Sequence, residues 1–143
     1  MDDEQRIRDV IEARIAAMAV GDARAAVAVL APDLVAFELA GPLQVPAPQA
    51  TDAAAMQAWL DSWDGPVETE IRDLRIHVSG DIAFCHSLNR LRATRRGGVV
   101  TDFWMRSTLG LCKRGGEWLI VHGHTSVPFQ LDGSFRAALD LVP

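Results

Sequence analysis

The first twenty residues of the chain repeat apolar side chains at the spacing of an α-helix. One stripe of such a helix carries Ile7, Val10, Ile11, Ile15 and Met18. Gly21 is a favourable residue for ending this helix, and Asp22 is a favourable N-cap for the next one. The pattern therefore predicts a long amphipathic helix followed by a short helix over residues 23–30.

The middle of the chain changes its pattern twice. Residues 34–39 read as a strand, and three prolines between residues 42 and 48 predict a loop after it. Thr51 or Asp52 can then cap a third helix, which runs to Trp63 and ends before a Gly-Pro pair.

From residue 67 onward the helical period gives way to alternation. We expect strands over residues 67–78, 82–94, 99–112 and 117–127, separated by short glycine-containing segments that are typical of hairpins. A last helical turn is predicted over residues 135–139. Helices followed by an antiparallel meander predict an α+β fold, organised as one domain over residues 1–143.

Composition and charge exclude several classes of protein. The chain has 143 residues, of which 49% are hydrophobic, and a net charge of −5 that argues against a nucleic-acid partner. No apolar run approaches the ~20 residues that span a bilayer, and the acidic N-terminus does not resemble a secretory signal. We therefore expect a cytoplasmic protein without a membrane partner, in which Cys85 and Cys112 are small, reduced core residues.

Two charged residues fall where apolar residues are expected. Arg14 lies within the apolar stripe of the first helix, and Glu38 shares a strand face with Leu34 and Ala36. Arg14 could extend from the edge of the stripe into solvent, or it could face a pocket, where a buried charge needs a partner. Glu38 could be a solvent-exposed carboxylate at the end of a strand, or a carboxylate at a pocket mouth.

The last two predicted strands each have one apolar and one mixed face. The apolar face of strand 99–112 carries Phe103, Met105, Leu109 and Leu111. Its mixed face carries Asp102, Trp104, Arg106, Thr108 and Cys112. The mixed face of strand 117–127 carries Trp118, Ile120, His122, His124 and Ser126.

The register of the hairpin between these strands decides whether the two mixed faces coincide. A three-residue loop over residues 114–116 places Arg106 opposite His124 and Thr108 opposite His122. A two-residue loop over residues 114–115 shifts the pairing by one residue and separates the faces. We favour the three-residue loop, because glycine suits its left-handed position.

Other candidate sites in the chain have simpler interpretations. His122 and His124 lack a third metal ligand at a suitable spacing, so a histidine pair in a polar pocket or interface is favoured over a metal site. Trp59 and Trp63, one helical turn apart, suit core packing or the lining of a pocket. Ser126 lacks the surroundings of a catalytic serine, and the chain has no glycine-rich phosphate loop.

Three motifs resemble the SnoaL-like (ketosteroid-isomerase-like) family of the nuclear transport factor 2 superfamily. They are Val20-Gly-Asp22 after the first helix, Trp104-Met-Arg-Ser-Thr108, and residues 118–128, which also resemble the association domain of calcium/calmodulin-dependent kinase. The resemblance implies a cone-shaped, cystatin-like fold, in which a curved antiparallel sheet packs on three N-terminal helices. It also implies an internal pocket and dimers that form through the sheet.

The resemblance also suggests roles for particular residues. Glu38 falls at the position of the general base of ketosteroid isomerases, Arg14 at that of the oxyanion tyrosine, and Thr108 near that of the oxyanion acid. The chain contains no tyrosine, so both oxyanion donors are changed. The permanent charge of Arg14 suits an anionic ligand, which argues against steroid isomerisation.

Two hypotheses follow for the function. In the first, the pocket binds a small, largely apolar carbonyl or carboxylate compound and acts as an isomerase, cyclase or lyase without cofactor or metal. Its catalytic residues would be Glu38, His124 and Arg106. Its ligand-binding residues would be Arg14, Trp59, Trp63, Trp104, Thr108, His122 and Ser126. In the second, the domain is a non-catalytic ligand-binding or homodimerisation module, with the apolar face of Phe103, Met105, Leu109 and Leu111 as the interface.

Overall fold

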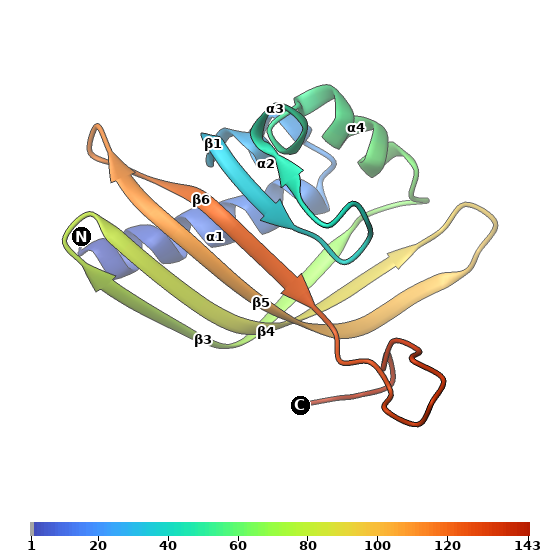
Figure 1. The fold of residues 1–143 in the computed structure, drawn as a ribbon. Coiled ribbons are helices and arrows are strands. Elements are labelled where there is room, and N and C mark those ends of the chain that lie inside the picture. Colours follow the sequence, from blue (N-terminus) through green and yellow to red (C-terminus); the bar gives the residue numbers. More distant parts are fainter. Residues whose placement is uncertain (1) are drawn as a thin grey trace.

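A long helix packs along one face of a six-stranded curved sheet in the computed structural model, which describes residues 2–143 (Figure 1). The helices are α1 (Asp3–Ala19), α2 (Ala23–Ala28), α3 (Ala47–Ala50) and α4 (Ala53–Asp61). The strands are β1 (Leu30–Phe37), β2 (Val45–Pro46), β3 (Glu68–Ser79), β4 (Ile82–Thr94), β5 (Val100–Arg114) and β6 (Glu117–Ser126).

The sheet is mainly antiparallel and runs in the order β2-β1-β6-β5-β4-β3. Among residues 2–143, only the β1–β6 pair is parallel, with Val35 opposite His122 and Phe37 opposite His124. We call the face that α1 covers the inner face and the opposite one the outer face. This arrangement confirms the predicted α+β class with a curved sheet on N-terminal helices.

Helix α1 begins and ends where its sequence predicts. The Asp2 carboxylate caps it by accepting a hydrogen bond of 2.8 Å from the backbone N–H of Gln5. Gly21, at a φ of +75°, lets the chain leave the helix. The apolar stripe buries Ile7 and Ile11 against inner-face residues such as Leu111 and Ile120. This contact forms the main core.

A second, smaller core lies where α4 meets the other end of the sheet. It consists of Ala23, Leu60, Trp63, Val67 and Ala93. The helix begins after Asp52, whose carboxylate accepts a hydrogen bond of 2.9 Å from the N–H of Ala54. The expectation that Asp52 could cap this helix is therefore confirmed.

Several local predictions need correction. The four strands of the meander match their predicted bounds within two residues, but β1 begins at Leu30, where a helix was expected to continue. The proline-rich loop contains β2 and α3, so the N-terminal part has one more helical turn than predicted. The helical turn expected over residues 135–139 is absent. There Ala137 bridges to Phe129 and Phe135 has a φ of 54°, which a right-handed helix does not allow.

The predicted register of the last hairpin is also wrong, for a specific reason. Arg114 pairs with Glu117, so the turn has two residues, Gly115 and Gly116. An irregularity in the β5–β6 pairing then shifts the register between Leu111 and Gly110, where Val121 is the extra residue of β6. This bulge splits the predicted mixed face of β6, because Trp118 and Ile120 before it lie in the main core on the inner face. After the bulge, β6 shares the outer face with the mixed face of β5, with Thr108 opposite His124 and Arg106 opposite Ser126.

The main core shows which face of β5 is the inner face. Leu111 is fully buried, and Leu109 packs against the same cluster. Because side chains alternate along a strand, Phe103 and Met105 share this inner face. The face that was expected to form a dimer interface is therefore the inner face: its Leu109 and Leu111 pack in the cluster that contains Ile7 and Ile11 of α1, and Met105 is buried as well.

The two cysteines lie on opposite faces of the sheet. Cys85 and Cys112 are both free, with Cys85 buried in the main core and Cys112 half-buried on the outer face. Among residues 2–143, none of the helices combines the length and the apolar character that crossing a bilayer requires.

The start of α1 is tied to the sheet by Asp3, which gives a testable pH dependence. Its carboxylate accepts hydrogen bonds from Trp118 Nε1 at 3.0 Å and from Lys113 Nζ at 2.9 Å. These two bonds, the tryptophan's first, lower the pKa of Asp3 below its usual value. The bonds to the ionised carboxylate therefore stabilise the fold above the unfolded-state pKa of about 3.9 and are lost as pH falls through the lower, folded-state pKa.

We expect Asp3→Asn to lower the stability of the protein near pH 7 and to flatten the loss of stability between about pH 5 and pH 2. Urea unfolding followed by tryptophan fluorescence at several pH values measures this change. Asp140→Asn, in the C-terminal segment, is a control for the loss of an exposed carboxylate elsewhere. Parallel stability curves for Asp3→Asn and the unsubstituted protein would contradict the assignment.

Candidate functional site

The inner face brings together two charged residues from elements far apart in the sequence. Arg14 lies on α1, and its Nη1 donates a hydrogen bond to the carbonyl of Ala26 in α2. Burial lowers the pKa of the Arg14 guanidinium, and the negative charge of Glu38 counteracts this effect. Arg14 is therefore partly buried and anchored to the backbone, and the charge of Glu38 acts on it from a distance. Within residues 2–143, no hydrogen bond or ion pair joins the two side chains.

Glu38 reaches this position because it follows directly after β1. Alternation along the strand puts Leu34 and Ala36 in the main core, and Glu38 continues their side of the strand beyond its last residue. Its side chain is exposed. The pair thus consists of an anchored cation and an accessible carboxylate.

The inner face carries further polar residues that the sequence reasoning missed. Ser107 of β5 is buried, with 7% of its surface exposed, and lies opposite Ser87 of β4. The hydroxyl of Ser87 donates a hydrogen bond of 2.6 Å to Asn89 Oδ1. The available signal was the alternation in residues 82–94, which places Ser87 and Asn89 on the same face as the buried Ala83 and Cys85.

The two tryptophans of the α4 region pack together. Trp59 and Trp63 meet edge to face, with ring centroids 5.8 Å apart, and the Arg95 guanidinium lies 3.8 Å from the Trp63 ring centroid. Trp63 is buried in the second core, whereas Trp59 is 38% exposed. Within residues 2–143, Trp63 Nε1 is a buried donor without a hydrogen-bond partner.

The remaining candidate residues lie on the outer face. His122 Nδ1 is 2.6 Å from the carbonyl oxygen of Val35, and the Phe37 ring contacts His122 and His124 edge to face. Arg106 Nε donates a hydrogen bond of 3.1 Å to Ser126 Oγ. The other outer-face candidates are Trp104 and Thr108, which alternate with the inner-face residues of β5.

The candidate residues therefore form two groups separated by the sheet. Arg14 and Glu38 lie on the helix-covered side, whereas Arg106 and His124 lie on the opposite side. The structure does not bring the four together around one hollow. The sequence pattern could not reveal this, because it shows which residues share a strand face but not which face the helices cover.

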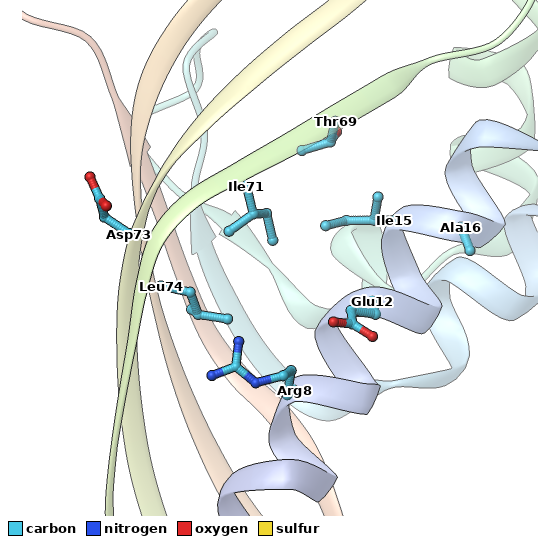
Figure 2. Close-up of a pocket in the computed structure, with 8 residues that line it drawn as sticks. All are labelled: Arg8, Glu12, Ile15, Ala16, Thr69, Ile71, Asp73 and Leu74. Atoms are coloured by element: carbon cyan, nitrogen blue, oxygen red, sulfur yellow. The ribbon is translucent and has the colours of Figure 1, made fainter. Parts of the chain in front are cut away.

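Neither of two clefts beside α1 is lined by Arg14 or Glu38. One, of about 490 Å³, lies between α1 and β3 (Figure 2). The other, of about 400 Å³, lies between the first turns of α1, the end of α2 and the start of β6. Within residues 2–143, no three His, Cys, Asp or Glu side chains cluster closely enough to hold a metal ion.

Comparisons with known proteins agree with this architecture. The family model of the SnoaL-like domain matches residues 7–130. A nuclear transport factor 2-like protein of unknown function from Pseudomonas putida KT2440 is 31% identical, with a TM-score of 0.84 over 98% of this chain and 96% of that one. No curated protein matches the chain in sequence.

Two more distant structures share the fold. A ketosteroid isomerase-like protein from Erwinia carotovora atroseptica SCRI1043 is 22% identical, with a TM-score of 0.71 over 88% of this chain and 97% of that one. An uncharacterized protein with a cystatin-like fold from Caulobacter vibrioides is 17% identical, with a TM-score of 0.71 over 86% of this chain and 87% of that one.

The two cysteines test the assignment of inner and outer faces. Burial raises the pKa of the Cys85 thiol to about 11, with a smaller opposing effect from a hydrogen bond to the Leu109 backbone. We expect Cys112→Ser, which keeps only Cys85, to react with a thiol-specific disulfide reagent at pH 8 only after denaturation. The matched Cys85→Ser variant should react in the folded state. Equal rates for the two folded variants would contradict the face assignment.

Proposed function

The chain belongs to the SnoaL-like family, and we propose that its inner face binds a small, largely apolar carbonyl or carboxylate compound beside Arg14 and Glu38. The juxtaposition of these two residues supports the proposal most directly. An apolar body would lie against the inner face, while its polar end would meet the guanidinium. No metal or cofactor enters the proposal.

Arg14 is suited to hold a negative charge. Its hydrogen bond to the Ala26 carbonyl uses one N–H of the guanidinium and fixes the orientation of the group. The remaining donors can bind a carboxylate or a developing enolate oxygen without rearrangement. Ser107, Ser87 and Asn89 add polar groups across the same face.

Glu38 is suited to move a proton. In the proposed reaction its carboxylate takes a proton from the carbon next to a carbonyl group, and the electron pair of the broken C–H bond forms an enolate. Arg14 stabilises the enolate oxygen. Return of the proton from Glu38 to the same or a conjugated carbon completes an exchange or an isomerisation, so that atoms and charge balance.

Arg106 and His124 take no part in this proton transfer, because they lie on the other side of the sheet. The reaction also differs from that of the ketosteroid isomerases, since the chain has no tyrosine to donate a hydrogen bond to the oxyanion. We therefore do not propose a steroid as the substrate.

A second candidate function is homodimerisation through the outer face. Phe84 and Ile82 of β4 are 52% and 66% exposed there, near the end of the β4–β5 ladder where Ile82 pairs with Cys112. A second copy that covers these side chains would remove apolar surface from water. The outer-face histidines and Arg106 then belong to the interface rather than to a catalytic site.

Isotope exchange in a simple ketone tests the proposed chemistry. We expect the protein to accelerate deuterium exchange at the α-carbon of 2-tetralone in D₂O, followed by proton NMR. Glu38→Gln should reduce the acceleration by at least about 100-fold, as expected for removal of a general base. Arg106→Gln, on the outer face, should leave it unchanged.

Ligand affinity separates binding from catalysis. Calorimetric titration with 2-naphthoate and the neutral 2-naphthamide should show tighter binding of the carboxylate. Arg14→Met should reduce the affinity for 2-naphthoate by about tenfold or more. Arg14→Lys, which keeps the positive charge, is the control: it should retain more of the affinity for 2-naphthoate than Arg14→Met does. Binding of 2-naphthoate without isotope exchange in 2-tetralone would indicate a non-catalytic ligand-binding module. Equal affinities of Arg14→Met and the unsubstituted protein for 2-naphthoate would contradict the proposed site.

A further inference from the structure

The cleft between α1 and β3 does not include Arg14 or Glu38, around which we proposed a site that we now call the inner site. Helix α1 contributes Arg8, Glu12, Ile15 and Ala16, and β3 contributes Thr69, Ile71, Asp73 and Leu74 (Figure 2). Its volume of about 490 Å³ falls within the range of roughly 300–1,000 Å³ that is typical of small-molecule pockets. A cleft of this size suits one small molecule rather than a folded partner.

A bulge in the edge strand shapes one wall of the cleft. The β3–β4 pairing shifts between Arg72 and Arg75, so that two residues of β3 fall opposite Ser87. Asp73 has a φ of 57°, in the left-handed region. As a result, Ile71 and Leu74 both point toward α1, although they are three residues apart, whereas Asp73 points away (Figure 2).

The floor of the cleft is apolar and continuous with the main core. Ile15, Ile71 and Leu74 are half-buried and pack against the buried core residues. In Figure 2 these three side chains point into the space between α1 and β3, and all three line the cleft. An alkyl or aryl group placed on this floor would cover apolar surface that now contacts water.

The wall formed by α1 carries a cation with unused donors. Arg8 extends from α1 toward β3, beside Leu74 (Figure 2). Within residues 2–143, its guanidinium makes no hydrogen bond to another residue, and its only ion pair is a 3.8 Å contact with Glu4, whose side chain is 60% exposed. Exposed pairs at this distance contribute little, so the five N–H groups of Arg8 remain available to a ligand.

We propose that the α1–β3 cleft is a second ligand site, which binds a small amphipathic carboxylate with its apolar group on Ile15, Ile71 and Leu74 and its carboxylate at Arg8. The proposal is independent of the inner site, since the two share no residue. Glu12, one helical turn from Arg8, opposes the ligand's charge and tunes the affinity.

Titration of the ¹⁵N-labelled protein with octanoate tests this proposal, with octanamide and octylamine as matched neutral and cationic probes. We expect octanoate to shift the backbone amide signals of Thr69, Ile71 and Leu74, and to bind at least about tenfold more tightly than octanamide. Arg8→Gln should reduce the affinity for octanoate to that for octanamide. Glu12→Gln should increase it.

Three further variants identify the site that responds. Ala16→Trp places a large side chain at the exposed edge of the cleft and should abolish the shifts, while the folded spectrum is retained. Arg6→Gln, on the other side of α1, and Arg14→Met, in the inner site, should leave octanoate binding at β3 unchanged. Shifts confined to residues around Arg14 and Glu38, loss of the β3 shifts in Arg14→Met, equal or tighter binding of octylamine, or no shift at all would each overturn the proposal.

Discussion

The packing of α1 on the inner face of the sheet is the contact on which the other features depend. Ile7 and Ile11 are buried against residues of β5 and β6, and Asp3 ties the first turn to Trp118 and Lys113. With these anchors at its start, the helix holds Arg14 over α2 and Arg8 over the edge strand β3. A rotation of α1 by one residue, about 100°, would move both cations away from their present neighbours.

The sheet then divides the polar residues of the chain into two populations. Arg14, Glu38, Ser87 and Ser107 belong to the helix-covered side, where partial burial strengthens charge interactions. The histidines and Arg106 belong to the outer side, where they lie among exposed apolar side chains. Our proposals accordingly place the chemistry on the inner side and the association on the outer side of the same sheet.

The sequence predicted the long helix and the four meander strands, but not the short elements or the faces. Strong alternation and glycine-containing turns predicted the four strands of the meander within two residues, because local propensity and burial agree there. The bulge at Val121 has no such local signal, and it alone decides which residues of β6 face those of β5. Glu38 and Arg14 were identified as misplaced charges, yet their proximity depends on β1 pairing with β6 and on α1 crossing the sheet. Ser87 and Asn89 were missed because serine and asparagine are common on exposed strand faces.

The attraction between Arg14 and Glu38 is the central claim, and a double-mutant cycle measures it directly. The free energy of unfolding in urea is compared for the unsubstituted protein, Arg14→Met, Glu38→Gln and the double variant. If the two side chains interact across the inner face, the double variant loses less stability than the sum of the single losses, beyond the ~0.3–0.5 kcal/mol scatter of independent sites. Losses that add within that scatter would contradict the account.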